Sequence, residues 1–447
     1  MARSPQRASR DTIAAFEAAG SPELVGRACR LQAYRPLPAV TPIATRGPFV
    51  AYASPDATFA VTRRILAAAS RSILIGIYDL EARYVVDLLK DALGRGVAVT
   101  LMLDLDGRSG ERPLYDELAA AGATCVPAPS CASRQSRYFS SSHEKILVVD
   151  DEWTLVQSGN WSTNSIPRNE VDGGDPAAWV PGNRDMGVAV RSPELAAFFG
   201  AVIRGDIDLE LNGAGPQAAG GGLADLPAVG AAQAAPRRRP LRTFPSRSFA
   251  PEAPVEVMPI LSPENYMATI PGLLRSARRS ILVEQQYIRG TQPQIRTLLD
   301  AIVTARVASP GLTVRIVLAA PFPGARFAKE AAAIRDLAAS HDLRLGRDVR
   351  ILNPRYLAHC HNKLIVVDDQ RVLVSSQNWS DLAVTSNREA GLLIPHAPIA
   401  RYFRAIFNLD WRTGVTRLVA RPKEILGPEA AGPTSSIPIA WGDYVEV

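Results

Sequence analysis

The chain has 447 residues, 47% of them apolar, and its 50 Lys and Arg outnumber its 44 Asp and Glu, which gives a formal net charge of +6. This apolar content can bury the cores of about two domains and excludes a protein that is disordered throughout. The basic excess fits contact with an anionic substrate or surface. It fits equally well the solvated arginines of a soluble enzyme.

The N-terminal extension, residues 1–45, is polar and holds no apolar core of signal-peptide length. No run of about 18 apolar residues occurs elsewhere, so the sequence predicts no transmembrane helix. We therefore expect a cytoplasmic protein, with at most peripheral contact with a membrane.

The four cysteines show no spacing typical of a disulfide framework. They are Cys29, Cys125, Cys131 and Cys360. Cys125 and Cys131 could pair across the short segment between them. We expect free thiols instead, as is usual in a reducing compartment.

Residues 46–211 form a first lobe, in which helical and extended segments alternate. A Ser-Pro-Asp phrase at 54–56 introduces a helix-like segment, and an apolar strand follows at 72–78. A helical stretch near 85–93 then leads into a strand at 97–104. Strands that alternate with helices indicate a layered α/β fold.

Residues 251–420 repeat this plan as a second lobe, with strands expected at 280–287 and 311–318. Each half closes with a helix that ends in a similar phrase, at 199–206 and 403–410. We therefore expect an internal duplication of α/β class. It would give two similar lobes, each a mixed β-sheet flanked by helices, related by a pseudo-two-fold axis.

Between the lobes, residues 212–250 are rich in Ala, Gly, Pro and Arg without a period, which predicts a linker. Its Arg237-Arg-Arg239 run could bind a polyanion, but we favour a solvated basic tether. Residues 421–447 form a C-terminal tail.

The same dense motif occurs once in each lobe. The copies are His143-Glu-Lys145-Ile-Leu-Val-Val-Asp150 and His361-Asn-Lys363-Leu-Ile-Val-Val-Asp368. At the same distance, each is followed by a second shared phrase, Ser158-Gly-Asn160 or Ser376-Gln-Asn378. Only five His and five Lys occur in the chain, so two of each within these motifs indicate selection for chemistry.

An extended strand places the His and Lys of His-x-Lys on one face, because side chains alternate along a strand. The apolar run that follows predicts a buried strand, and the Asp-Asp pair after it predicts a tight hairpin turn. The returning strand would bring the Ser and Asn back beside the His and Lys. Such a buried polar cluster is costly unless it is used, so we interpret it as a site.

The cluster suits a phosphodiester. The two lysines would neutralise the non-bridging oxygens, and Asn and Ser would add hydrogen bonds. Imidazole can attack phosphorus or protonate a leaving oxygen, and in-line displacement needs one group on each side of phosphorus. One motif supplies one His, so we expect a single site shared by both motifs.

A His in either role needs an acceptor on its other ring nitrogen, and two Asn-Arg-acid phrases supply Asp185 and Glu389. Asp150 and Asp368 complete the motifs and are counted with the catalytic set. They fall out of register with the His face, however, and are expected to anchor the hairpin or pair locally. No cofactor and no metal are expected. His359 and His361 share a face, but no further Cys or His cluster completes a metal site.

These residues resemble the phospholipase D superfamily, whose hallmark is a paired His-x-Lys-x4-Asp motif followed by Gly/Ser-Ser-x-Asn. The resemblance spans nearly the whole chain outside the extension, the linker and the tail. It implies a two-lobed α/β fold with the site at the lobe interface. It also implies a covalent phosphohistidine intermediate, which water or an alcohol releases.

By this resemblance His143 is the nucleophile and His361 is the general acid and then the base, although the reverse order stays open. The resemblance also implies which side chains bind the phosphate and which support them. Lys145, Lys363, Asn160 and Asn378 would bind it, with support from Ser158 and Ser376.

Two departures from the family pattern bear on the substrate. Asp185 stands where many members carry Glu, and a similar Asp in some bacterial phospholipases D favours a lipid. Asn-Trp-Ser at 160–162 and 378–380 replaces a phrase typical of cardiolipin synthases, which argues against a standard enzyme of that group.

The first interpretation is therefore a phospholipase D that hydrolyses phospholipids or transfers their phosphatidyl group to an alcohol, as a monomer. The alternative is a metal-independent nuclease of the same superfamily acting on DNA or RNA. A silent binding module is disfavoured, because both motifs are complete. We expect specificity to lie in the loops at 133–140, 166–182 and 321–323. Trp179 in the second loop could contact acyl chains or bases, or pack under its own loop.

Overall fold

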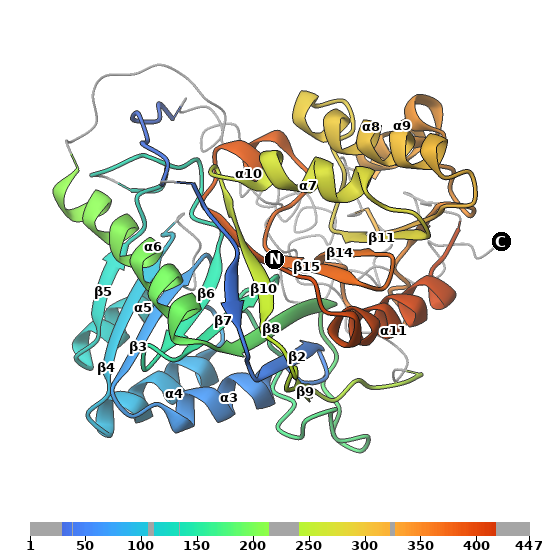
Figure 1. Cartoon of the computed structure of the whole chain (residues 1–447). Coiled ribbons are helices and arrows are strands. Elements are labelled where there is room, and N and C mark those ends of the chain that lie inside the picture. The colour runs from blue at the N-terminus through green and yellow to red at the C-terminus, as the bar shows by residue number, and fades with distance from the viewer. Residues whose placement is uncertain are drawn as a thin grey trace, which may run out of the picture.

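The computed structural model describes residues 29–37, 39–105, 111–133, 135–213, 241–321 and 327–416. In this part of the chain, two lobes of similar build lie side by side, each around one large sheet (Figure 1). The expected α/β fold with two similar lobes is confirmed. Most of the expected linker, including Arg237-Arg-Arg239, lies outside the described residues, as does the C-terminal tail.

The first lobe is built on an 8-stranded mixed sheet. In sheet order its strands are β5 (Thr124–Pro127), β4 (Ala98–Leu103), β3 (Ser72–Ile77), β6 (Lys145–Val149), β7 (Trp153–Gln157), β8 (Asp185–Arg191), β2 (Phe49–Ser54) and β9 (Arg247–Phe249). The strands β3, β4 and β5 are parallel, and the other neighbours are antiparallel. The strand β6 is buried along its whole length, because both faces of the sheet are covered.

The second lobe repeats this sheet strand for strand. In the same order its strands are β13 (Val349–Ile351), β12 (Thr313–Leu318), β11 (Ser280–Gln285), β14 (Lys363–Val367), β15 (Arg371–Ser375), β16 (Glu389–Ile394), β10 (Val255–Ser262) and β1 (Ile43–Thr45). The strands β11, β12 and β13 are again the parallel ones. The duplicated sequence phrases therefore occupy equivalent places in the two sheets.

The two lobes exchange their edge strands. The strand β1 comes just before the first lobe in sequence, yet it pairs with β10 of the second lobe. Conversely, β9 comes just before the second lobe and pairs with β2 of the first. Each expected lobe boundary, at 45/46 and at 250/251, therefore follows a strand that belongs to the other sheet.

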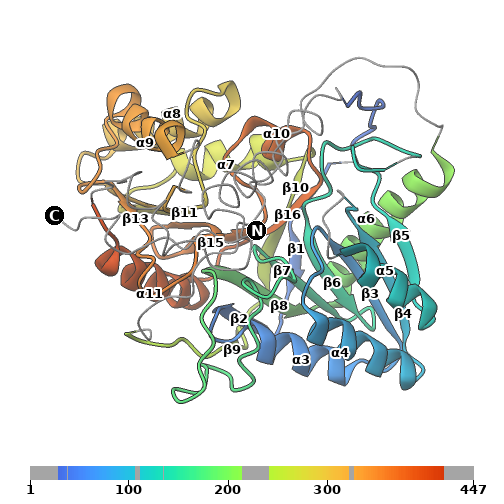
Figure 2. The same cartoon turned by 180° about the vertical axis from the view of Figure 1, so that it is seen from behind.

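Helices cover the outer faces of both sheets and fill the space between them. The outer helices of the first lobe are α3 (Thr58–Ala68), α4 (Arg83–Gly94) and α5 (Glu111–Ala120), seen from behind in Figure 2. Those of the second lobe are α7 (Tyr266–Arg275), α8 (Pro293–Ala308), α9 (Phe327–His341) and α10 (Asp381–Thr385). The inner helices are α6 (Pro193–Asn212) and α11 (Ala397–Thr413). No helix among the described residues is both long and apolar enough to cross a membrane.

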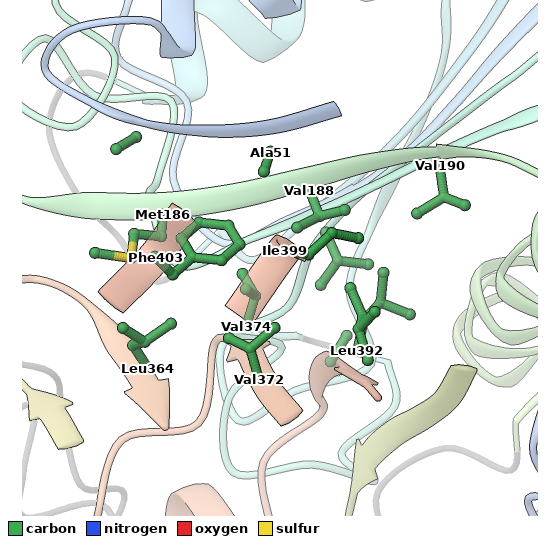
Figure 3. Close-up of a cluster of buried hydrophobic side chains, with 14 of the residues drawn as sticks. Ala51, Met186, Val188, Val190, Leu364, Val372, Val374, Leu392, Ile399 and Phe403 are labelled. Carbon is green, nitrogen blue, oxygen red and sulfur yellow. The ribbon is translucent and has the colours of Figure 1, made fainter. Parts of the chain in front are cut away.

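One apolar core joins the two lobes (Figure 3). Met186 and Val188 of β8 lie near Val372 and Val374 of β15, and Phe403 of α11 packs among them. All five side chains are almost completely buried. Since a fully buried aliphatic or aromatic side chain contributes about 1.5–3 kcal/mol, this shared core fixes the sheets against each other.

The N-terminal extension is fastened to the loop that precedes the first motif. Cys29 forms a disulfide with Cys131, so the expectation of free thiols is wrong for these two residues. Cys125 and Cys360 are free, as expected. Next to the disulfide, the backbone N–H of Gln32 donates to the carbonyl of Arg137 at 2.7 Å. The described start of the extension, at Cys29 and Gln32, is therefore held beside the polypeptide that leads to His143.

We predict that reduction of the Cys29–Cys131 disulfide, or Cys131→Ser, lowers the free energy of unfolding by about 2–4 kcal/mol. The bridge spans 102 residues, and losing it frees a long loop of the unfolded chain. Denaturant unfolding with and without reductant measures the difference. Cys125→Ser is the matched control, because Cys125 forms no bridge and its variant should respond to reductant as the parent does. Equal stability of the oxidised and reduced parent would contradict the prediction.

Candidate active site

The two motifs meet at one place between the lobes. Lys145 opens β6 and Lys363 opens β14, so each His and Lys lies at the start of a buried strand. His143 is 2% exposed and His361 is 8% exposed. The charge of Lys145 acts on His361, and the charge of Lys363 acts on Lys145, so the motifs are electrostatic neighbours. This arrangement has the geometry expected of a shared site.

Each histidine is held by an acid from the other lobe. His143 Nδ1 lies 2.9 Å from Glu389 Oε2, and His361 Nδ1 lies 2.9 Å from Asp185 Oδ1. Both acids are buried. Asp185 reaches its histidine at the same distance as Glu389, so the shorter side chain does not lengthen the contact. In each ring the acid holds Nδ1, so Nε2 lies on the opposite edge of the imidazole.

The two serines of the second phrases hold these acids. Ser158 Oγ donates to Asp185 Oδ1 at 2.8 Å, and Ser376 Oγ donates to Glu389 Oε2 at 2.5 Å. Each hydroxyl also accepts the backbone N–H of the residue after the acid. Each serine has a single hydroxyl proton, and that proton is directed at the acid. The serines therefore support the site by holding the acid rather than by donating to a phosphate.

The Arg of each Asn-Arg-acid phrase brings its acid across the interface. The carbonyl of Arg388 accepts the N–H of His143 at 2.7 Å, and the carbonyl of Arg184 accepts the N–H of His361 at 3.0 Å. Each Arg thus forms a β-bridge with the residue just before the motif of the other lobe, Arg388 with Ser142 and Arg184 with Cys360. The sequence showed these Arg as repeated residues, but their part in the site was missed.

The same arginines are anchored by buried carboxylates. Arg184 Nε and Nη2 donate to both oxygens of Asp410 at 2.7 and 3.1 Å. Arg388 makes the equivalent pair with Asp206 at 2.7 and 2.9 Å. Asp206 and Asp410 are the ends of the repeated closing phrases, so a signal for this pairing was present in the sequence. Bidentate contacts of this kind fix the orientation of the guanidinium group.

Burial sets the charge of the lysines. It lowers the pKa of Lys145 to about 7 and the pKa of Lys363 to about 8. Each ammonium group donates to a carbonyl of its own motif, Lys145 to His143 and Lys363 to His361. Both amines are therefore poised to gain charge when an anion enters the site.

The two histidine–acid pairs differ in the pKa values of their acids. Burial would raise the pKa of Asp185, but attraction and a hydrogen bond from His361 hold it below its usual value. Burial and the charge of Lys363 lower the pKa of His361 to about 4, so this ring is neutral near pH 7. In the other pair, burial raises the pKa of Glu389 to about 8, against attraction by Lys145.

The two asparagines occupy equivalent places but have different partners. Asn160 Nδ2 donates to Asp79 Oδ2 at 3.1 Å, which leaves its second N–H for another acceptor. The Oδ1 atoms of both Asn160 and Asn378 are buried and have no hydrogen-bond partner among the described residues. Asp79 was not singled out from the sequence, and its equivalent in the second lobe is Tyr287.

Asp150 and Asp368 are not brought to the cluster, so the structure does not support their place in the catalytic set. They follow the far ends of β6 and β14, where both take positive φ values of 55° in the hairpin turn. Asp150 accepts backbone N–H groups from residues 70–72, and Asp368 accepts those of residues 278–280. These contacts are those of a hairpin anchor, as the register indicated.

Each lobe also buries a carboxyl group beside an Arg–Asp pair, contributed from different positions. In the first lobe it is Glu144, within the motif, and in the second it is Glu284 of β11. Gly76 stands where the second lobe has Glu284, and a Cβ there would lie 3.0 Å from Glu144 Oε1. Burial raises the pKa of Glu144 to about 8 and that of Glu284 well above its usual value. The exchange of positions was not visible from the motif alone.

The expected specificity loops are only partly described. Trp179 donates its Nε1–H to Asp56 Oδ1 at 3.2 Å and packs against Gly174, so it belongs to its own loop's packing. Ser133 binds Glu210 through its hydroxyl. Arg134 and residues 322–326 lie outside the described residues. Within the described ranges, no group of three or more His, Cys, Asp or Glu side chains is placed to hold a metal ion.

The family model for "Cardiolipin synthase, PLD-like domain" matches residues 62–199 and 270–411. No curated protein matches the chain in sequence. Among solved structures, phosphatidylserine synthase from Haemophilus influenzae Rd KW20 is similar at a TM-score of 0.55 and 15% identity, over 85% of this chain and 89% of that chain. At this identity the likeness shows a common fold.

Two further structures are similar at scores too low to carry an argument. Polyphosphate kinase from Porphyromonas gingivalis has a TM-score of 0.47 and 13% identity, over 80% of this chain and 50% of that chain. Nuc, a phospholipase D family member from Salmonella typhimurium, has a TM-score of 0.30 and 18% identity, over 36% of this chain and 93% of that chain. The family model itself covers more than half of the chain, once in each lobe, and the chain belongs to the phospholipase D-like family.

Proposed function

We propose that this protein is a phospholipase D-type phosphodiesterase that hydrolyses phospholipids or transfers their phosphatidyl group to an alcohol. The observation that supports it most directly is the pair of cross-lobe contacts, His143 with Glu389 and His361 with Asp185. The two oriented imidazoles supply a nucleophile and an acid, and the two buried lysines beside them supply a cationic binding site for one phosphodiester.

The proposed reaction has two displacements at phosphorus. In the first, His143 Nε2 attacks phosphorus while the P–O bond to the leaving alcohol breaks, and His361 gives its proton to the alcohol oxygen. In the second, His361 takes a proton from water or an acceptor alcohol. The resulting oxygen nucleophile attacks phosphorus, and the P–N bond to His143 breaks. The bound anion offsets the repulsion of Lys363, which lets His361 carry the proton that it lacks in the free protein.

No protein-bound metal is needed in this scheme, because Lys145, Lys363 and the two asparagines take the charge of the phosphate oxygens. The lipid substrate is favoured by Asp185, since the family resemblance implies a similar Asp in some bacterial phospholipases D, and by the fold likeness to a phosphatidylserine synthase. Of the Arg side chains that suggested nucleic acid, Arg242 and Arg247 lie over the rings of Phe244 and Phe249.

The disulfide bears on the compartment. A bridge between Cys29 and Cys131 is typical of proteins that fold in an oxidising environment. We therefore propose an oxidising compartment in place of the cytoplasmic location expected from the sequence.

The covalent step predicts a trapped intermediate. With a phosphatidyl 4-nitrophenyl ester, whose leaving group needs no acid, His361→Ala should release about one equivalent of 4-nitrophenolate and then stall. Turnover should fall by about 10²- to 10⁴-fold, because the base for the second step is missing. Mass spectrometry should find the phosphoryl group on His143. Release of the burst from His143→Ala instead would reverse the order of the histidines, and a burst from neither variant would contradict the covalent scheme. His396→Ala, on a histidine outside the site, is the control.

The lysine charges predict a dependence of KM on pH. Lys145 and Lys363 bind an anion only when protonated, and their pKa values of about 7 and about 8 lie below the ordinary 10.5. KM should therefore rise as pH increases through 7 and 8, by about tenfold or more for the loss of a charged hydrogen bond. In Lys145→Arg the guanidinium stays charged, so the rise should shrink even if turnover falls. A KM that stays constant until pH 10.5 would contradict the assignment.

Substrate class is tested directly by assays on phosphatidylcholine micelles and on single-stranded DNA, both with EDTA. We expect release of phosphatidic acid that EDTA does not reduce, and no cleavage of DNA. EDTA-resistant DNA cleavage without lipid turnover would establish the nuclease instead. Turnover of neither substrate would favour a silent binding module.

A further inference from the structure

The two halves of the site are alike at the catalytic positions but differ in the residues beside them. The residue after β3 is Tyr78, and its equivalent after β11 is Gln286. The residue two before the motif is Ser141 in the first lobe and His359 in the second. A phosphodiester has two different substituents, so unlike surroundings on the two sides can distinguish them.

On the His143 side these positions are occupied by contacts within the protein. The Tyr78 ring lies 4.6 Å from the His143 ring, and Lys145 Nζ lies 5.0 Å from the centre of the Tyr78 ring. Ser141 Oγ donates to Asp104 Oδ2 at 3.1 Å. This side packs the imidazole against an aromatic face, as suits a ring that must keep one orientation.

On the His361 side the same positions form a polar pair. Gln286 Nε2 lies 3.2 Å from His359 Nε2, and both side chains are more than nine-tenths buried. Burial, together with the charges of His361 and Lys363, lowers the pKa of His359 to about 3, so this ring is neutral and lies close to the catalytic groups. The pair is therefore part of the surroundings of His361.

The carbonyl oxygen of Gln286 is the unexplained atom of this pair. Its Oε1 is buried and has no hydrogen-bond partner among the described residues, and the same is true of Asn378 Oδ1. A buried acceptor without a donor costs about 1–3 kcal/mol, so such atoms in a native protein call for water or a ligand. Amide oxygens accept hydrogen bonds, and the missing partner is therefore a donor.

The charges near Gln286 and His359 determine which kind of hydrogen-bond donor can bind there. Lys363 is cationic when an anion is bound, and it acts on His359. An ammonium group beside this lysine would be repelled, whereas a hydroxyl group carries a donor without charge. Asp185 is the carboxylate whose charge acts on His359, and it is already engaged by His361 and Ser158. Asp79 accepts from Asn160 in the first lobe.

We propose that Gln286 and His359 form a subsite that binds a second hydroxyl group of the alcohol exchanged at phosphorus, and so favours vicinal diols over simple alcohols. The inference rests on the proposed lipid reaction and on His361 as its acid and base. In an in-line displacement the exchanged alcohol lies opposite the nucleophile, beside the acid and base. The reacting hydroxyl then faces His361, and its neighbour donates to Gln286 Oε1.

The test is a competition for one phosphohistidine. The protein cleaves the phosphatidyl 4-nitrophenyl ester in the presence of equal concentrations of 1,2-propanediol and 1-propanol, which differ by one hydroxyl group. The ratio of the two phosphatidyl products is measured by mass spectrometry. Because both alcohols react with the same intermediate, the ratio does not depend on the rate of the first step. We expect the wild-type protein to prefer the diol by about tenfold, the value of one hydrogen bond to a buried acceptor.

Gln286→Met keeps the length of the side chain but removes the acceptor, and it should bring the ratio close to one. His359→Ser, which copies the first lobe, should lower it as well. Gln370→Met, at the exposed turn between β14 and β15, is the matched control and should keep the wild-type ratio. An unchanged ratio in Gln286→Met, no preference in the wild type, or transfer to neither alcohol would overturn the subsite. Absence of 4-nitrophenolate from the wild-type reaction would instead overturn the lipid reaction, and the subsite with it.

Discussion

The reciprocal docking of each Asn-Arg-acid phrase against the opposite motif is the contact on which the site depends. Arg388 and Glu389 of the second lobe lie beside the first motif, and Arg184 and Asp185 of the first lobe lie beside the second. Neither lobe alone can hold its own histidine, because the acid that orients the ring comes from its neighbour. Duplication has therefore produced one site from two incomplete halves rather than two sites.

The cost of burying charge explains why this contact is so specific. Arg184 and Arg388 are almost completely buried, and each is matched by a bidentate carboxylate, Asp410 or Asp206. Buried ion pairs add little net stability compared with apolar residues of the same size, but breaking one leaves an uncompensated charge at a cost of about 3–5 kcal/mol. Such pairs are therefore formed in only one alignment of the two lobes. The shared apolar core supplies the free energy that stabilises the folded protein.

The exchange of β1 and β9 works in the same direction. Each short strand completes the sheet of the lobe that it does not precede, so the two sheets are linked by backbone hydrogen bonds as well as by side chains. The extension before β1 adds a further link near the site. Tyr34 accepts from Arg388 Nη2 at 2.7 Å and donates to Glu264 at 2.5 Å, within the segment that the Cys29–Cys131 disulfide fastens.

Much of this arrangement could be predicted from the sequence, because the internal duplication repeats the same motifs in both halves of the chain. The repeated alternation of strands and helices predicted the fold class, and the repeated His, Lys, Ser, Asn and acid positions predicted the residues that the structure gathers. The out-of-register positions of Asp150 and Asp368 predicted the hairpin anchors. What could not be predicted depends on which lobe a side chain reaches. The pairing of Asp185 with His361, rather than with His143, has no local signal, because only packing of the sheets decides it. Residues that differ between the halves, such as Gln286 and His359, could not be predicted either, because a comparison of the repeats identifies only the positions that they share.

The disulfide was missed for a related reason. Its partners are separated by 102 residues and have no framework spacing, so only the folded chain shows that the extension returns to the loop before the first motif. The extra buried acids illustrate the same limit. Glu144 and Glu284 perform equivalent packing from unlike positions, and alignment of the repeats would not match them.

The central claim is that each histidine is oriented by the acid of the other lobe, and nitrogen NMR of the imidazole rings tests it most directly. With only five histidines in the chain, ¹⁵N-histidine labelling can resolve each ring. In Glu389→Gln we predict that the Nδ1 signal of His143 shifts while that of His361 stays in place, and Asp185→Asn should do the reverse. A shift confined to the histidine of the same lobe as the substituted acid would contradict the account.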